Sequence, residues 1–141
     1  MTLVRDSRGG QKLACLHRKE GGAYHLVLYL PEEQTLRVGS LGEIAFRGGY
    51  YVYTGSAIRG IDARVRRHLS NRKRQHWHID YLLDAAAVVR TICVPSKERE
   101  ECARNANVAK LPGAQPMNGF GSSDCRCASH LFYFPLDPAI T

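Results

Sequence analysis

Basic and aromatic residues gather in one stretch of the sequence, from residue 49 to residue 80. Between Arg59 and Arg74 there are seven lysines and arginines, opposed only by Asp62, so this segment carries +6 (seven minus one) of the formal net charge of +7. Tyrosines precede the run, and histidines and a tryptophan follow it. A positive field beside aromatic rings is typical of a surface that binds a polyanion such as nucleic acid. The alternative is a solvated basic face without a partner.

The chemistry of these side chains suggests how they would bind nucleic acid. Guanidinium and ammonium groups neutralise phosphates, and an exposed indole ring can stack on a base. The residues that we expect to contact nucleic acid are Arg67, Arg72, Lys73, Arg74, His76, Trp77 and His78. Two points stay open. Trp77 either stacks on a base or caps the hydrophobic core, and Asp80 either orients a histidine or caps the following helix.

A second group of reactive side chains lies near the C-terminus, at Cys125, Cys127 and His130. Thiolates and imidazoles bind zinc, although Cys-x-Cys is not the commonest spacing of zinc ligands. A fourth ligand would have to come from His76, His78 or Cys102. The alternative, which the spacing favours, is a pair of small buried thiols near a turn.

Composition places the chain among ordinary globular proteins. It has 141 residues, of which 44% are hydrophobic and 23% charged, enough for one domain with a core. No apolar run approaches the roughly 20 residues that a membrane helix needs, and the first ten residues lack the apolar segment of a signal peptide. The five cysteines are odd in number and unevenly spaced. We therefore expect reduced thiols in an intracellular, cytoplasmic protein with no membrane partner.

The first half of the chain predicts strands and then a helix. Apolar and β-branched residues favour strands over residues 23–30, 35–38, 43–46 and 50–54. Gly55 and Ser56 are expected to end the last of these. A helix is then predicted over residues 61–69, because Ile61, Val65 and Leu69 form one apolar stripe.

The second half predicts helices that alternate with single strands. We expect a helix over residues 79–86, a strand over 87–94, a helix capped by Ser96 that runs to about Lys110, a loop over 113–123 and a strand over 130–134. Residues 1–21 are expected to form a weakly ordered segment and residues 22–141 a single domain. The fold class is therefore predicted as α+β, with a small mainly antiparallel β-sheet flanked by about three helices.

Several short motifs, taken in order, resemble those of the GIY-YIG nuclease superfamily. Tyr24 after Ala23 looks like the first half of its signature, and residues 53–57 look like the second half. Arg64 and His68, one helical turn apart, resemble the Arg and His that follow.

Two later runs, at residues 76–83 and 119–133, resemble the Uri-type branch of this superfamily, the DUF123 domain. The resemblance covers residues 22–134. Superfamily members often have an Asn in the last motif, where this chain has Gly. The candidate replacements are Ser122, Ser123 and Asp124.

The resemblance implies a GIY-YIG-like nuclease domain over residues 22–141. Its implied activity is metal-dependent DNA endonuclease activity in DNA repair or processing, with DNA and repair proteins as partners. It also implies one Mg²⁺ or Mn²⁺ ion held by a Glu on the third helix. Of Glu98, Glu100 and Glu101, we choose Glu101, because its position ten residues before Leu111 fits the branch best. The implied catalytic residues are Tyr24, Tyr53, Arg64, His68 and Glu101.

Each implied role suits the side chain, and each side chain also has a plain structural role. A tyrosine can position water or accept its proton if cations lower its pKa, Arg64 can bind phosphate, and His68 can relay a proton. Without the motifs, the tyrosines would be core residues and Glu101 would simply favour a helix N-terminus. Two other functions remain open: an inactive nucleic-acid-binding module of a repair complex, and a zinc-stabilised interaction domain.

Overall fold

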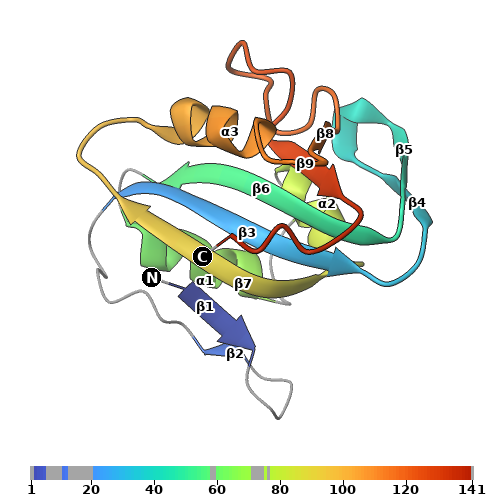
Figure 1. The fold of residues 1–141 in the computed structure, drawn as a ribbon, viewed down its shortest axis with the longest axis horizontal. Coiled ribbons are helices and arrows are strands. Elements are labelled where there is room, and N and C mark those ends of the chain that lie inside the picture. The colour runs from blue at the N-terminus through green and yellow to red at the C-terminus, as the bar shows by residue number, and fades with distance from the viewer. Residues whose placement is uncertain are drawn as a thin grey trace.

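A computed structural model describes residues 2–5, 11–12, 21–57, 60–70, 75 and 77–140 of the chain. Over this part, the chain forms a seven-stranded sheet, a separate two-stranded hairpin and three α-helices (Figure 1). Every strand pairing in the two sheets is antiparallel. The predicted α+β class is therefore confirmed.

The large sheet has the strand order β2-β1-β7-β3-β6-β9-β8. Its strands are β1 (Thr2–Arg5), β2 (Gln11–Lys12), β3 (Gly22–Leu30), β6 (Gly49–Ala57), β7 (Ala87–Pro95), β8 (Gln115–Pro116) and β9 (Leu131–Phe134). β3 lies at the centre between β6 and β7, as its near-continuous apolar run predicts. The strands β4 (Gln34–Arg37) and β5 (Glu43–Phe46) form the separate hairpin around a short 3-10 helix, Gly39–Leu41.

β6 extends further than its sequence predicts. Gly55 and Ser56 were expected to end the strand, but it continues to Ala57 and pairs there with Gly22 of β3. The prediction is wrong because the partner strand β3 continues to the same point, so the ladder of backbone hydrogen bonds outweighs the low strand propensity of Gly and Ser.

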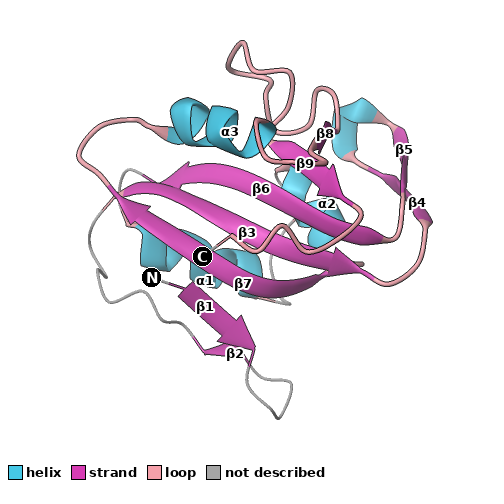
Figure 2. Cartoon of the chain, viewed as in Figure 1, coloured by secondary structure: helices cyan, strands magenta, loops and turns pink. Residues whose placement is uncertain are grey.

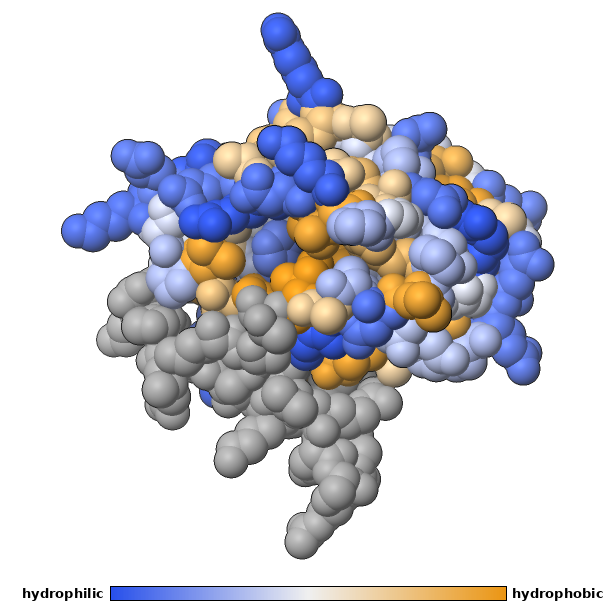
Figure 3. All heavy atoms as spheres, viewed as in Figure 1, coloured by the Kyte–Doolittle hydropathy of each residue, from blue (hydrophilic) through white to orange (hydrophobic). Residues whose placement is uncertain are grey.

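The helices divide between the two faces of the sheet. α1 (Ile61–Leu69) and α2 (His78–Leu83) lie on one face, and α3 (Glu101–Ala109) lies on the other (Figure 2). A large core cluster that includes Leu26 and Val65 fills the α1 and α2 side. A smaller cluster that includes Val27 and Val108 fills the α3 side. Apolar residues also show in the middle of the α3 face, between polar side chains (Figure 3).

α1 begins and ends where the apolar stripe predicts, whereas α3 begins later than expected. Ser96 does not cap α3, because its hydroxyl accepts a hydrogen bond from the backbone N–H of Glu98 in a local turn. The helix therefore starts at Glu101. As a result, Glu101 lies in the first turn of α3, at the end of a connecting loop.

The N-terminal residues contribute strands that the sequence pattern does not indicate. β1 pairs with β7, and β2 pairs with β1.

Cys93 of β7 is disulfide-bonded, so the expectation that all five cysteines are reduced is wrong for this residue. Among the described residues, no helix is long and apolar enough to cross a membrane.

Candidate active site

A buried pair, Tyr24 and His68, lies where β3 meets α1. The Tyr24 hydroxyl lies 2.6 Å from Nε2 of His68, and the two side chains are almost fully buried. Tyr24 comes from the first half of the motif pattern and His68 from the last turn of α1, 44 positions apart. The structure therefore brings together two residues that the sequence selects independently.

A cleft of about 330 Å³ opens above the Tyr24 hydroxyl. Of the five implied catalytic residues, the four that line it are Tyr24, Tyr53, Arg64 and Glu101. The fifth, His68, lies behind Tyr24 and reaches the cleft through the hydroxyl of that residue. The residues come from β3, β6, α1 and α3, so elements on both faces of the sheet meet at this cleft.

The protonation of the tyrosines follows from their surroundings. Burial raises the pKa of Tyr24 well above its usual range, Tyr53 raises it further, and the Arg64 guanidinium opposes both. Burial and the nearby Glu101 carboxylate likewise raise the pKa of Tyr53. Both tyrosines therefore carry their protons at neutral pH. Arg64, one of the cations expected to lower a tyrosine pKa, lowers that of Tyr24 too weakly to offset burial.

Gly55 shows why the second half of the motif pattern requires a glycine. It lies directly opposite Tyr24 in the β3–β6 pairing. A Cβ atom at this position would lie 2.5 Å from the Tyr24 hydroxyl oxygen, closer than side-chain carbons pack. Glycine therefore leaves the space in which the hydroxyl reaches His68.

The three glutamates considered as metal ligands have different surroundings. Glu101 is half-buried and lines the cleft beside Tyr53 and Arg64. Glu100 accepts hydrogen bonds from the Arg104 guanidinium, and Glu98 is exposed outside this cleft. On geometry, Glu101 is the only one of the three whose carboxylate faces the buried tyrosines.

Trp77 packs between cationic side chains at the rim of the cleft. The guanidinium of Arg64 lies 4.4 Å from the centre of its indole ring, and that of Arg67 lies 4.0 Å from it. Such cation–π contacts hold both arginines in place. Trp77 is half-buried and also packs against His68, so it links the cleft to the core.

Asp80 is the buried anion that supports α1. Its carboxylate accepts two hydrogen bonds from the Arg67 guanidinium and one from the backbone N–H of Trp77, and it lies 4.0 Å from Nδ1 of His68. Of the two roles considered for Asp80, the cap of α2 is present, and the carboxylate also lies near a histidine. The carboxylate favours a proton on Nδ1, which leaves Nε2 to accept the Tyr24 hydroxyl proton.

Replacing Asp80 with asparagine should lower the free energy of unfolding by about 3 kcal/mol, since it breaks a charge pair whose anion is fully buried. Urea unfolding followed by circular dichroism measures this loss. Glu100→Ala is the matched control. It removes a partly exposed i,i+4 pair with Arg104 and should cost less than about 1 kcal/mol. Equal losses in the two variants would contradict the structural role of Asp80.

The structure describes only some of the residues that were expected to contact nucleic acid. Trp77 and His78 line the cleft, and Nδ1 of His78 accepts a hydrogen bond from the backbone N–H of Gly121. Arg67 is held by Asp80 and lines a separate shallow hollow with Ala57 and Gly60. Four of the expected contacts, Arg72, Lys73, Arg74 and His76, lie outside the described residues.

The loop that follows β8 supplies further lining residues of the cleft, and two of them, Ser123 and Asp124, are among the candidate replacements named from the sequence. Gly121 has a left-handed backbone (φ +69°), and a Cβ there would lie 3.2 Å from the Tyr53 ring. The loop thus folds back over the cleft, and Ser123 and Asp124 line it. Ser122 does not. Closely spaced glycines were the sequence signal for this turn.

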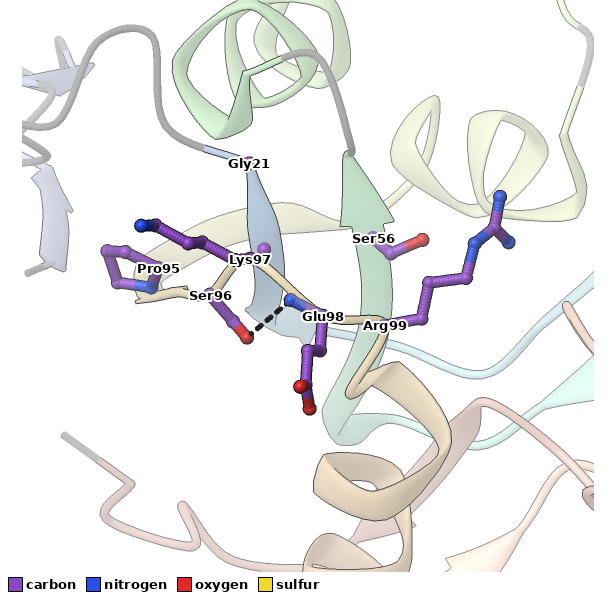
Figure 4. A pocket seen from close by; sticks show the side chains of 8 residues that line it. Gly21, Ser56, Pro95, Ser96, Lys97, Glu98 and Arg99 are labelled. Carbon is purple, nitrogen blue, oxygen red and sulfur yellow. Dashed lines mark hydrogen bonds between the residues drawn. The ribbon is translucent and has the colours of Figure 1, made fainter.

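A larger hollow of about 680 Å³ adjoins the cleft and contains none of the candidate catalytic residues. Ser56 and Arg99 line both spaces. In Figure 4, the side chains of Ser56 and Arg99 extend to one side, whereas Lys97 extends to the other. Lys97 and Arg99 are cationic side chains that line this hollow, and neither was selected from the sequence.

Cys102 of α3 completes a group of four metal-ligand side chains with Cys125, Cys127 and His130. Their ligand atoms all lie within 4.8 Å of one another, so this cluster could hold a metal ion. Burial and the two neighbouring thiols raise the pKa of Cys102 to about 12. Cys125 and Cys127 were expected to be only small thiols near a turn. That interpretation is incomplete, because α3 brings a third thiol, that of Cys102, to them.

Comparison with known proteins gives a family but no named relative. No curated protein matches the chain, and no solved structure matches it. The family model described as "Domain of unknown function DUF123" matches residues 23–140. This range includes the cleft and the Cys/His cluster. The chain therefore belongs to the DUF123 family.

Proposed function

We propose that this protein is a metal-dependent DNA endonuclease of the GIY-YIG type. The observation that carries the proposal is the 2.6 Å contact between the Tyr24 hydroxyl and His68, at the base of a cleft that also contains Arg64 and Glu101. Hydrolysis of a phosphodiester needs a proton acceptor, a cation for the phosphate and stabilisation of the leaving oxygen. Side chains suited to each need meet in this cleft.

The side chains of the cleft suit a hard divalent cation. Mg²⁺ binds oxygen ligands, keeps several waters and takes only one or two carboxylates from the protein. Glu101 provides one carboxylate in the cleft, and Asp124 provides a second, exposed one. A bound Mg²⁺ or Mn²⁺ would stabilise the charge on the phosphate and on the leaving oxygen. The Cys/His cluster belongs to another class, because thiolates select zinc over magnesium.

Tyr24 and His68 can move the proton of the attacking water. Because Tyr24 is protonated, it cannot act as a base by itself. The water proton can pass to the Tyr24 oxygen as the Tyr24 proton passes to Nε2 of His68. The imidazolium that results lies near the Asp80 carboxylate, which stabilises its charge. The hydroxide attacks phosphorus, and the leaving oxygen departs with the electron pair of the broken P–O bond.

Arg64 is suited to hold the phosphate during this reaction. Its guanidinium donates a hydrogen bond of 3.1 Å to the carbonyl oxygen of Ser56 and stacks on Trp77. These contacts fix the cation at the rim, so it loses little freedom on binding. The pentavalent phosphate carries more negative charge than the substrate, so a fixed cation favours the transition state.

The decisive test is cleavage of labelled duplex, single-stranded and flap DNA by the wild-type protein. Reactions contain Mg²⁺, Mn²⁺ or a chelator. We expect products that require the metal, because burial keeps Tyr24 protonated and it therefore does not activate water unaided. Absence of products from every substrate would contradict the nuclease. If DNA binding then remains salt-sensitive, the chain acts as an inactive nucleic-acid-binding module instead.

A further inference from the structure

The four ligand atoms of the Cys/His cluster fit one tetrahedral zinc ion. With Zn–S bonds of about 2.3 Å and a Zn–N bond of about 2.0 Å, a tetrahedral site separates sulfur from nitrogen by about 3.5 Å. Nε2 of His130 lies 3.3 Å from Sγ of Cys125 and 3.8 Å from Sγ of Cys102. With Cys127 also within 4.8 Å of the others, a single ion could contact all four atoms after small adjustments.

The surroundings of His130 leave the correct nitrogen available. Its Nδ1 lies 3.0 Å from the backbone carbonyl oxygen of Thr54. A carbonyl can only accept, so Nδ1 must carry the ring proton. The lone pair of the neutral ring is then on Nε2, which faces the thiols. Metal-binding histidines are commonly oriented by a second hydrogen bond of this kind.

His130 is also tied firmly to the sheet. Besides the side-chain bond, the backbone N–H of Thr54 donates to the carbonyl oxygen of His130, and the N–H of His130 donates to that of Phe120. The residue is 3% exposed. One ligand of the cluster is thus fixed beside Tyr53 and Gly55 of the cleft. The three thiols come from α3 and from the loop after β8, and none is disulfide-bonded.

We propose that Cys102, Cys125, Cys127 and His130 bind one zinc ion that clamps the start of α3 to this loop and to β9. Four protein ligands fill a tetrahedron and leave no open position, as in structural rather than catalytic zinc sites. The clamp has a direct consequence for the cleft. Glu101 precedes Cys102, and Asp124 precedes Cys125, so the ion fixes the backbone beside both carboxylates. That consequence for cleavage rests on the proposed function, whereas the zinc site does not.

Metal analysis of the purified full chain tests the site directly. We expect about one zinc per chain, as four ligands specify. We also expect most of it to be lost in Cys102→Ser and in Cys125→Ser. Arg126→Ala is the matched control, because Arg126 is exposed between two ligands, and it should keep its zinc. A wild-type protein that binds no zinc would overturn the proposal, as would Cys102→Ser that retains it fully.

Cobalt replaces zinc in a second measurement, which keeps the proposal testable if the serine variants do not fold. The wild-type chain loaded with Co²⁺ should show intense thiolate-to-cobalt absorption and the visible bands of tetrahedral cobalt. Octahedral spectra without the thiolate band would overturn the site.

Hydrogen exchange of the wild-type chain before and after zinc removal tests the clamp. We expect faster exchange in residues 101–104 and 119–130, and no change in β3. Unchanged exchange in the first two segments would overturn the clamp. None of these readouts uses cleavage, so a chain that binds zinc and cleaves nothing would contradict only the proposed nuclease.

Discussion

Replacing Glu101 with alanine should reduce metal-dependent DNA cleavage by at least about a thousandfold, because the metal supplies several kcal/mol of transition-state stabilisation. Glu101 is the half-buried carboxylate of the cleft, and the other lining carboxylate, Asp124, is exposed. The fold should survive, since an acidic residue at a helix N-terminus contributes at most about 2 kcal/mol when partly buried. Initial cleavage rates in Mg²⁺, together with circular dichroism, measure both effects.

Glu98→Ala is the matched control for this variant. Glu98 lies three residues earlier in the chain, is exposed and lies outside the cleft. The Glu98→Ala variant should cleave DNA at the wild-type rate. Equal losses in the two variants would point to a general effect of charge on DNA binding. Full activity in Glu101→Ala would remove Glu101 from the proposed metal site.

Replacing Tyr24 with phenylalanine should lower the cleavage rate by about 10² to 10⁴, the range for loss of a proton-transfer group. The ring keeps its packing in the core, and only the hydroxyl that contacts His68 is lost. DNA affinity should stay unchanged, because the Tyr24 side chain is almost fully buried and its hydroxyl carries no charge. Single-turnover cleavage and equilibrium binding, measured in parallel, separate the two quantities.

Tyr53→Phe distinguishes the two tyrosines. Tyr53 also lines the cleft, and its ring centre lies 6.1 Å from that of His68. Of the two hydroxyls, the Tyr24 hydroxyl is the one 2.6 Å from a histidine nitrogen. We therefore expect the smaller rate loss for Tyr53→Phe. The reverse ranking would show that water loses its proton to Tyr53 and that the Tyr24–His68 contact is structural.

Local patterns in the sequence predicted most of the elements. The apolar stripe of Ile61 and Val65 places α1 correctly because both side chains are buried against the sheet. The start of α3 could not be predicted in this way. Ser96 fits the pattern of a helix cap, but its hydroxyl satisfies a nearer backbone N–H in a turn. The extent of β6 depends on its partner strand, which no local pattern describes.

The residue types of the candidate site could be predicted from the sequence, but the contacts between their side chains could not. The spacing of Arg64 and His68 shows that both lie on one helix, yet which tyrosine contacts His68 depends on the packing of β3 against α1. The metal cluster shows the same limit. Cys125 and Cys127 are two positions apart in sequence, whereas Cys102 joins them only because α3 packs beside the last loop. Long-range packing of this kind leaves no periodic signal.

The pairing of Thr54 with His130 has a consequence for the order of folding. These residues are 76 positions apart, and their backbone and side-chain bonds join β6 to the start of β9. Contacts between distant parts of a chain form slowly, because a long loop must close first. β3 and β6, by contrast, are separated by a short stretch and can pair early. We therefore expect the cleft to be completed late, when the C-terminal strand docks on a sheet that has already formed.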